Sequence, residues 1–231
     1  MGESEAGLEL KQQLFAELAR VNRALAAPAR LELLQLLAQT ERSVEVLAEL
    51  AHLSVANTSQ HLRVLRRSGL VTSRRDGQFV RYRLPGPEPV RLLATLHAIA
   101  AHSSPVLARL VDTLRRTTDG LEPISAEELA SRSDEGLVTV IDVRPPEEFA
   151  SGHIPRAINI PLARLNDETA RLPVDREVVA YCRGVLCIMS MEAVFRLRNA
   201  GLSARRLEFG FPEWRASGRP IASLNGLPQS A

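Results

Sequence analysis

A short loop in the second half of the chain holds both of its cysteines, and this loop constrains the fold more than any other feature. Cys182 and Cys187 follow an apolar run, residues 177–181, and precede a helix-like run, residues 188–195. The thiols are therefore predicted where a strand ends and a helix begins. Unpaired N–H groups at a helix start carry partial positive charge, which favours the reactive thiolate form. Arg183 adds a full positive charge beside Cys182.

The composition is that of an ordinary globular protein of one or two domains. Of the 231 residues, 45% are hydrophobic and 24% are charged. No stretch approaches the roughly 18 apolar residues that span a membrane, and the acidic residues 1–7 do not resemble a secretory signal. We therefore expect a cytoplasmic protein, in which two cysteines are more often reactive or metal-binding than a structural disulfide.

Positive charge is concentrated in the first half. Residues 1–118 hold 16 Lys and Arg against 11 Asp and Glu, whereas residues 119–231 hold 13 against 16. Residues 63–83 contain seven arginines and one acid, Asp76. A basic segment within a near-neutral protein indicates a local polyanion site, although such a run can also be only a solvated face.

Helical periodicity dominates the beginning of the chain. Apolar residues at helical spacing predict a first helix within residues 8–25. Pro28 suits the first turn of a second helix, which continues through residues 29–37. Ser43 can cap a third helix, residues 44–51.

A helix-turn-helix and a hairpin follow. Ser54 can cap a fourth helix, residues 55–67, and only two residues separate it from the third. Asp76-Gly77, placed between two β-rich runs within residues 70–84, is a strong hairpin signal. A helix-turn-helix followed by a basic hairpin is a winged helix.

The fourth helix and the wing supply the candidate DNA contacts. Small polar side chains of the helix can reach base edges in the major groove, and arginines can neutralise phosphates. The candidates are Ser54, Asn57, Thr58, Ser59, Gln60, His61, Arg63, Arg67, Arg74, Arg75 and Arg81.

Over roughly residues 10–105, the chain resembles the ArsR/SmtB family of bacterial repressors. The matching residues are 53–71, then Arg74, Asp76-Gly77 and Tyr82-Arg83 of the wing. The resemblance implies a homodimer, an imperfect palindromic double-stranded DNA operator, and release of the DNA when an inducer binds. Residues 90–116 hold apolar side chains at helical spacing, the last of which are Val106, Leu110 and Leu114. In such a homodimer these side chains could build the interface between the two copies, or they could instead belong to the core.

The metal sites usual in that family are missing from this sequence. Ser43 and Glu45 stand where many members place cysteines at the start of the third helix. His97 and His102 lie five residues apart, which does not stack them on one helical face, and matching carboxylates are lacking. We therefore predict no metal site and no cofactor, and the DNA-binding half has no visible sensor of its own.

The second half alternates strands and helices, which predicts a parallel α/β sheet. Ser125 with Glu128 forms a capping box before a first helix. Buried-type strands are predicted at residues 137–144 and 178–181, with shorter elements at residues 147–149 and 152–161. Parallel sheets bind ligands at the carboxyl ends of their strands, which is where Asp142 and Cys182 fall.

Over roughly residues 122–222, this half resembles a rhodanese domain. The matching motifs are residues 140–144, 147–149, 152–157, 181–184 and 210–214. The resemblance implies that Cys182 accepts a sulfane sulfur as a persulfide and passes it to a nucleophile, while loop amides hold the anionic sulfur. The candidate site residues are Cys182, Arg183, Gly184, Cys187, Asp142 and Arg144, of which the last two either brace the loop or take part in catalysis.

Two positions in the loop separate alternative chemistries. Phosphatases and arsenate reductases of the same fold carry an arginine where this chain has Ile188, and an uncharged residue cannot clamp oxyanion oxygens bidentately. Cys187 is either a small buried apolar side chain or a resolving thiol that attacks a modified Cys182.

The sequence thus predicts two domains: a mainly α winged helix-turn-helix, residues 1–118, and an α/β rhodanese domain with a parallel sheet, residues 119–224. Residues 117–123 are expected to form a hinge, and residues 225–231 a flexible tail. The favoured hypothesis is a homodimeric DNA-binding repressor that senses or takes up sulfane sulfur at Cys182, with rhodanese-type activity and a small sulfur donor or thiol acceptor as partner.

Two alternatives stay open. The chain could be primarily a thiosulfate or persulfide sulfurtransferase tethered to DNA. Less favoured is a metalloid-responsive repressor that uses both cysteines, because two thiolates from one loop are poor coordination without a third ligand.

Overall fold

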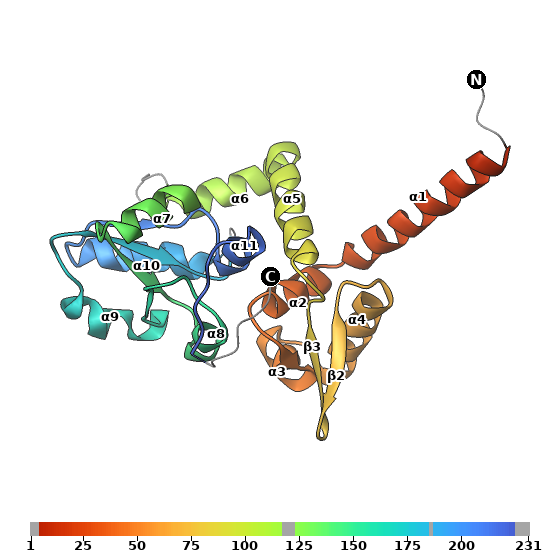
Figure 1. Cartoon of the computed structure of the whole chain (residues 1–231), viewed down its shortest axis with the longest axis horizontal. Coiled ribbons are helices and arrows are strands. Elements are labelled where there is room, and N and C mark those ends of the chain that lie inside the picture. Colours follow the sequence, from red (N-terminus) through yellow and green to blue (C-terminus); the bar gives the residue numbers. More distant parts are fainter. Residues whose placement is uncertain (1–4, 117–122, 185–186, 225–231) are drawn as a thin grey trace. The chain divides into compact units, whose positions relative to one another are not determined.

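Two different sheets give the chain its two architectures (Figure 1). The structure, a computed structural model, describes residues 5–116, 123–184 and 187–224. Its contacts divide the chain into one unit of residues 1–89 and another of residues 90–231. The domain boundary predicted at residue 118 differs from this division and stays a prediction. The predicted hinge, apart from its last residue, and the predicted tail after residue 224 lie outside the described residues.

The first unit is a helix-turn-helix with a small antiparallel sheet. Its helices are α1 (Glu5–Leu25), α2 (Pro28–Leu37), α3 (Val44–Leu50) and α4 (Val55–Arg67), and its strands are β1 (Arg42–Ser43), β2 (Thr72–Asp76) and β3 (Phe79–Arg83). The four predicted helices and the hairpin are confirmed, and β1 is an addition that extends the sheet in the order β1-β3-β2.

Local side-chain chemistry explains these boundaries. The hydroxyl oxygen of Ser43 accepts a hydrogen bond from the Val46 N–H at 3.4 Å, and that of Ser54 accepts one from the Asn57 N–H at 3.2 Å. Both serines therefore act as the predicted N-caps. In the hairpin, Asp76 pairs with Phe79, so the two-residue turn begins at Gly77, whose positive φ of 61° suits glycine.

The second unit is an α/β domain preceded by two helices. Its helices are α5 (Glu88–Ser103), which starts two residues before the unit, α6 (Pro105–Arg116), α7 (Ala126–Asp134), α8 (Pro146–Ser151), α9 (Leu165–Glu168), α10 (Ile188–Asn199) and α11 (Phe211–Ala216), with the 3₁₀ turns η1 (Leu162–Arg164) and η2 (Thr169–Arg171). Its strands are β4 (Val138–Asp142), β5 (Ile158–Asn159), β6 (Glu177–Tyr181) and β7 (Ala204–Arg206). The strands are parallel in the order β5-β4-β6-β7, as the sequence predicts.

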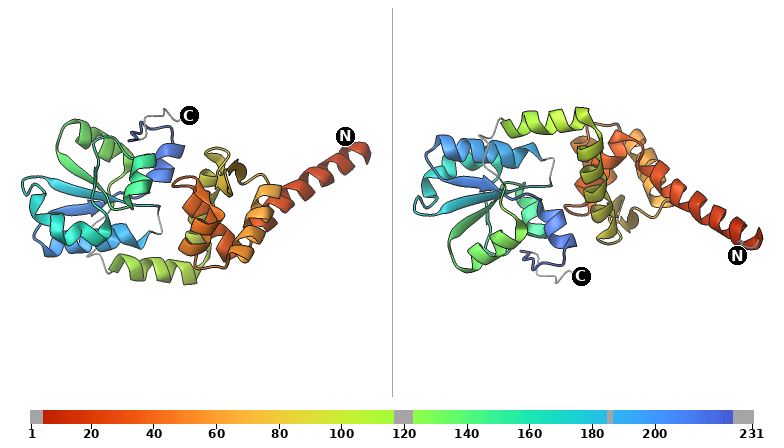
Figure 2. Two further views of the ribbon diagram at one scale, coloured as in Figure 1. Left: turned by 90° about the horizontal axis from the view of Figure 1, so that it is seen from below. Right: turned by 90° about the horizontal axis from the view of Figure 1, so that it is seen from above.

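Alternating side chains of the central strands build a core on each face of this sheet. From β6, Val178 and Ala180 pack with α9 and α10, whereas Val179 and Tyr181 pack with α7 and α11. This period of two is the strand signature, and every one of these four side chains is fully buried. Figure 2 shows the helices of this unit on both sides of the sheet. None of the helices that the structure describes has the length and apolar character needed to span a bilayer.

Candidate functional site

The cysteine loop leaves the carboxyl end of β6 and enters α10. Asp142, at the end of β4, lies in register with Tyr181, so the ends of the two central strands meet at the predicted edge of the sheet. Cys182 directly follows Tyr181 and is 1% exposed. Cys187 is the residue before α10, and its N–H donates to the Gly184 carbonyl at 3.0 Å. The strand-to-helix position of the loop is therefore confirmed.

The two thiols of this loop are joined. A disulfide links Cys182 and Cys187, whose Cα atoms lie 6.3 Å apart. Val185 and Leu186 are outside the described residues, so their amides are not described. The bond agrees with the interpretation of Cys187 as a resolving thiol, because the two sulfurs reach each other within one loop.

Arg183, the residue after Cys182, pairs with a carboxylate of α8. Its guanidinium forms a bidentate pair with Glu148 of α8, with Nε 3.0 Å from both carboxylate oxygens and Nη2 2.6 Å from Oε1. Glu148 is fully buried, while the Arg183 side chain is 21% exposed. The positive charge that the sequence places beside Cys182 is therefore balanced by a buried carboxylate, and this pair fastens the loop to α8.

A glycine at the start of α11 lets this helix close against the loop. A Cβ at Gly210 would lie 2.2 Å from the Gly184 nitrogen and 2.6 Å from the Arg183 carbonyl carbon, closer than real side chains approach. The Phe211 N–H donates to the Cys182 carbonyl at 3.0 Å. The beginning of α11 is therefore the backbone support of the loop, a role that the sequence pointed to only through the family motif at residues 210–214.

Asp142 and Arg144 form a wholly buried ion pair behind the loop. The Arg144 guanidinium donates from Nη2 to Asp142 Oδ2 at 2.6 Å and to the Gly152 carbonyl at 2.8 Å, and the Arg144 backbone N–H donates to Oδ1 at 3.0 Å. The guanidinium also lies 4.4 Å from the ring centre of Phe211. Both side chains are 0% exposed, which favours the bracing role among the two that the sequence left open.

Burial also sets the protonation of Tyr181. Removal of its side chain from water raises the pKa of Tyr181 well above its ordinary value, and the nearby Asp142 carboxylate adds to the rise. Its hydroxyl oxygen accepts a hydrogen bond from the Ile154 N–H at 3.1 Å. The tyrosine is thus a neutral core residue directly before the cysteine loop.

The candidate DNA-reading residues of α4 divide by exposure. Asn57 and Gln60 are exposed, and Ser59 and His61 are partly exposed. Thr58 is 0% exposed, and its hydroxyl has no hydrogen-bond partner among the described residues. Its selection as a base contact is therefore wrong, because it sits on the core face of the helix.

The candidate phosphate-contacting arginines also fall into two groups. Arg63, Arg67 and Arg75 are exposed and pair with no acid in the part of the chain that the structure describes. Arg74 instead binds Glu41 through two hydrogen bonds of 2.5 and 3.1 Å, and Arg81 binds Asp76 at 2.5 Å. Exposed pairs of this kind are worth little, about 0–1 kcal/mol, so a phosphate can compete for these two side chains.

Comparisons with known proteins found a family model that matches each half of the chain. The model for "Bacterial regulatory protein, arsR family" matches residues 27–73, and the model for "Rhodanese-like domain" matches residues 125–217. The HTH-type transcriptional regulator Rv0324 of Mycobacterium tuberculosis is 43% identical over 212 residues, which cover 91% of this chain and 92% of the relative. A sulfurtransferase of Allochromatium vinosum is 33% identical over 105 residues, which cover 45% of this chain and 96% of the relative.

Solved structures of winged helix-turn-helix domains are among those similar to part of this chain. The homodimeric winged helix-turn-helix DNA-binding domain Mb0332 from Mycobacterium bovis, a possible ArsR-family transcriptional regulator, is 38% identical; the match covers 44% of this chain and 91% of that chain, with a TM-score of 0.39. The family assignment rests on Rv0324, which this chain matches over nearly its full length, and on the two family models. The chain therefore belongs to the ArsR family of DNA-binding transcriptional regulators and carries a rhodanese domain in its second half.

Proposed function

We propose that this regulator is a repressor that takes up sulfane sulfur at Cys182 and thereby loses affinity for its operator. The observation that carries the proposal is the location of the thiols. Both cysteines of the chain lie in one loop of the rhodanese domain, and residues 1–118, which include the helix-turn-helix, contain none. A sulfur signal can therefore enter only through this loop.

The chemistry uses a polysulfide as oxidant and both thiols in turn. The Cys182 thiolate attacks a sulfur of the polysulfide, whose S–S bond breaks and releases a chain one sulfur shorter, so that Cys182 becomes a persulfide. The Cys187 thiolate then attacks Cys182 Sγ and displaces hydrosulfide, which leaves the disulfide. The bonded pair in the structure corresponds to the end of this sequence.

A continuous set of contacts can carry a change in the loop towards the DNA-binding elements. The Cys182 carbonyl accepts from Phe211 at the start of α11. At the end of α11, the Ala216 carbonyl accepts from Arg91 Nη2 at 2.7 Å and Nε at 3.2 Å. Arg91 belongs to α5, which begins at Glu88, shortly after the wing strand β3 ends.

This route makes a specific prediction for Arg91. In the Arg91→Met variant, which keeps an apolar stem and loses both hydrogen bonds, Cys182 should still take up sulfur. DNA affinity should then respond less to polysulfide than in the wild-type protein. A variant that releases DNA as fully as wild type would remove this route and leave the sulfur chemistry untouched.

The proposed partners are a second copy of the chain and double-stranded DNA. Helix α1 exposes a row of apolar side chains, including Leu14, Phe15 and Leu18, each about 60% exposed. Ile99 of α5 and Leu110 of α6 are equally exposed. Exposed rows of large apolar side chains are typical of protein interfaces, which supports a homodimer.

The proposal is tested by mass and DNA binding together. Intact mass after reduction and polysulfide treatment should rise by about 32 Da in the Cys187→Ser variant, whereas the wild-type protein should end about 2 Da below its reduced mass. In a gel-shift titration the Cys182→Ser variant should stay bound to DNA in polysulfide. Release of DNA by that variant to the wild-type extent would refute the proposal.

A second function is favoured by one observation. The similarity to a sulfurtransferase spans 96% of that relative and 45% of this chain, and the rhodanese-like family model, residues 125–217, includes the loop. Under this alternative, the chain transfers sulfur catalytically from thiosulfate to a thiol or to cyanide. Thiocyanate formation with repeated turnover, lost in the Cys182→Ser variant, would support it; a single stoichiometric loading without turnover would leave the regulatory function alone.

A further inference from the structure

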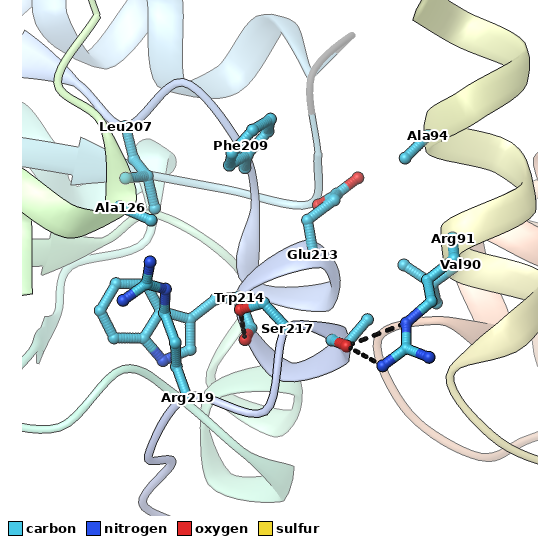
Figure 3. A pocket seen from close by; sticks show the side chains of 11 residues that line it. Val90, Arg91, Ala94, Ala126, Leu207, Phe209, Glu213, Trp214, Ser217 and Arg219 are labelled. Atoms are coloured by element: carbon cyan, nitrogen blue, oxygen red, sulfur yellow. Dashed lines mark hydrogen bonds between the residues drawn. The ribbon is translucent and has the colours of Figure 1, made fainter.

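A cavity of about 290 Å³ lies within the second unit, and neither Cys182 nor Cys187 is among the residues that line it (Figure 3). Helices α5, α7 and α11 contribute to its walls, together with the segments on either side of α11. Its apolar surface comes from Val90, Leu207, Phe209 and Trp214. An apolar cavity near 300 Å³ with a few polar groups is typical of sites for small organic molecules.

The positively charged side chain of Arg219 lines one side of this cavity. The Arg219 guanidinium carbon lies 5.3 Å from the ring centre of Trp214, and the Trp214 indole N–H donates to the Pro220 carbonyl at 2.8 Å. The Nε atom of Arg219 is buried and has no acceptor among the residues that the structure describes. A buried donor without an acceptor is unfavourable, so the site is complete only when a bound molecule supplies an acceptor.

The other charged groups of the wall are already engaged. Glu213 accepts a hydrogen bond from the Gly210 N–H at 3.0 Å, and burial raises the pKa of its carboxyl. Figure 3 shows Glu213 well apart from Arg219, on the side towards Ala94. Arg91 directs two donors to the Ala216 carbonyl. Among the charged side chains of the cavity wall, Arg219 is therefore the one with a donor, its Nε, that lacks an acceptor among the described residues.

We propose that this cavity binds a small carboxylate with an apolar tail. The carboxylate accepts a charge-assisted hydrogen bond from Arg219 Nε, and the tail packs against Trp214, Leu207 and Phe209. Neither cysteine takes part, so the proposal does not depend on the sulfur chemistry. It assigns this regulator a second small-molecule site on the helix whose other end supports the cysteine loop.

Trp214 is the only tryptophan of the chain, so its fluorescence reports directly on this cavity. The probe is cyclohexylacetate, compared with its neutral amide, cyclohexylacetamide, on the full chain. The acid should change the emission saturably and bind about tenfold or more tightly than the amide, because a hydrogen bond between charged groups is stronger than one to a neutral acceptor.

Three variants locate the effect. Arg219→Met, which keeps the apolar stem, should bring acid and amide to within about twofold of each other. Ala94→Phe should fill the cavity and abolish binding of both probes. Arg171→Met, at a side chain 77% exposed, should behave as wild type.

Two results would overturn the proposal. One is equal affinity for acid and amide in the wild-type protein, or an unchanged preference in Arg219→Met. The other is no saturable change in Trp214 emission up to about 10 mM acid, a concentration at which even a weak specific site is filled. Loss of polysulfide response in the Cys182→Ser variant has no bearing on either result, so this test and that of the sulfur chemistry fail independently.

Discussion

Replacement of Asp142 by asparagine should strongly destabilise the rhodanese domain. The carboxylate accepts one backbone and three guanidinium contacts from Arg144, at 2.6 to 3.1 Å, and neither side chain is exposed. Asp142→Asn keeps the size of the side chain and removes the negative charge that Arg144 binds directly. Breaking a buried pair in this way lowers the free energy of unfolding by about 3–5 kcal/mol.

Urea unfolding followed by Trp214 fluorescence measures this change in the relevant domain, because the only tryptophan of the chain packs in its core. The control is Asp134→Asn, which breaks the pair with Arg156, whose side chain is 64% exposed. That change should lower the free energy of unfolding by about 1 kcal/mol or less. A loss in Asp142→Asn as small as in the control would mean that water reaches the pair and that it does not brace the loop.

Three further predictions follow from other contacts. Gly210→Ala should lower the free energy of unfolding in the same assay by about 1–3 kcal/mol, because its Cβ meets backbone of the loop; an unchanged value would show that α11 does not close against it. Arg75→Ala should reduce the slope of log DNA affinity against log salt by about one, if this exposed arginine contacts a phosphate, and an unchanged slope would exclude that contact. Thr58→Val removes a buried hydroxyl that has no partner among the described residues, so it should raise the free energy of unfolding, measured by circular dichroism, by about 1 kcal/mol. DNA affinity should stay within about twofold of wild type, and a large loss of affinity would restore Thr58 as a DNA contact.

Local chemistry made much of the fold predictable. Ser43 and Ser54 cap helices because the acceptor and the N–H it serves lie three residues apart in the sequence. The two central strands of the parallel sheet were visible as short apolar runs. In contrast, β7 is only three residues long, Ala204–Arg206, and its sequence offers one apolar side chain, so its pairing with β6 could not be anticipated.

The features of the candidate sites that the sequence did not reveal depend on contacts between distant parts of the chain. Arg183 pairs with Glu148, which is 35 residues away in the sequence. No local sequence pattern indicates that this carboxylate is buried beside the cysteine loop. Thr58 lies in a row of polar residues, and only packing of α4 against the rest of the first unit decides that this side chain faces inwards. Residue type suggests the chemistry of a site, while burial decides which residues are available for it.

DNA affinity before and after polysulfide treatment, measured on the reduced full chain, tests the central proposal most directly. Fluorescence anisotropy with a selected DNA fragment should show a large loss of affinity for the wild-type protein and none for Cys182→Ser, with the loss of about 2 Da that marks the disulfide checked by intact mass in the wild-type samples. Equal loss of affinity in both proteins, or complete disulfide formation in the wild-type protein with unchanged affinity, would contradict control of DNA binding by this cysteine.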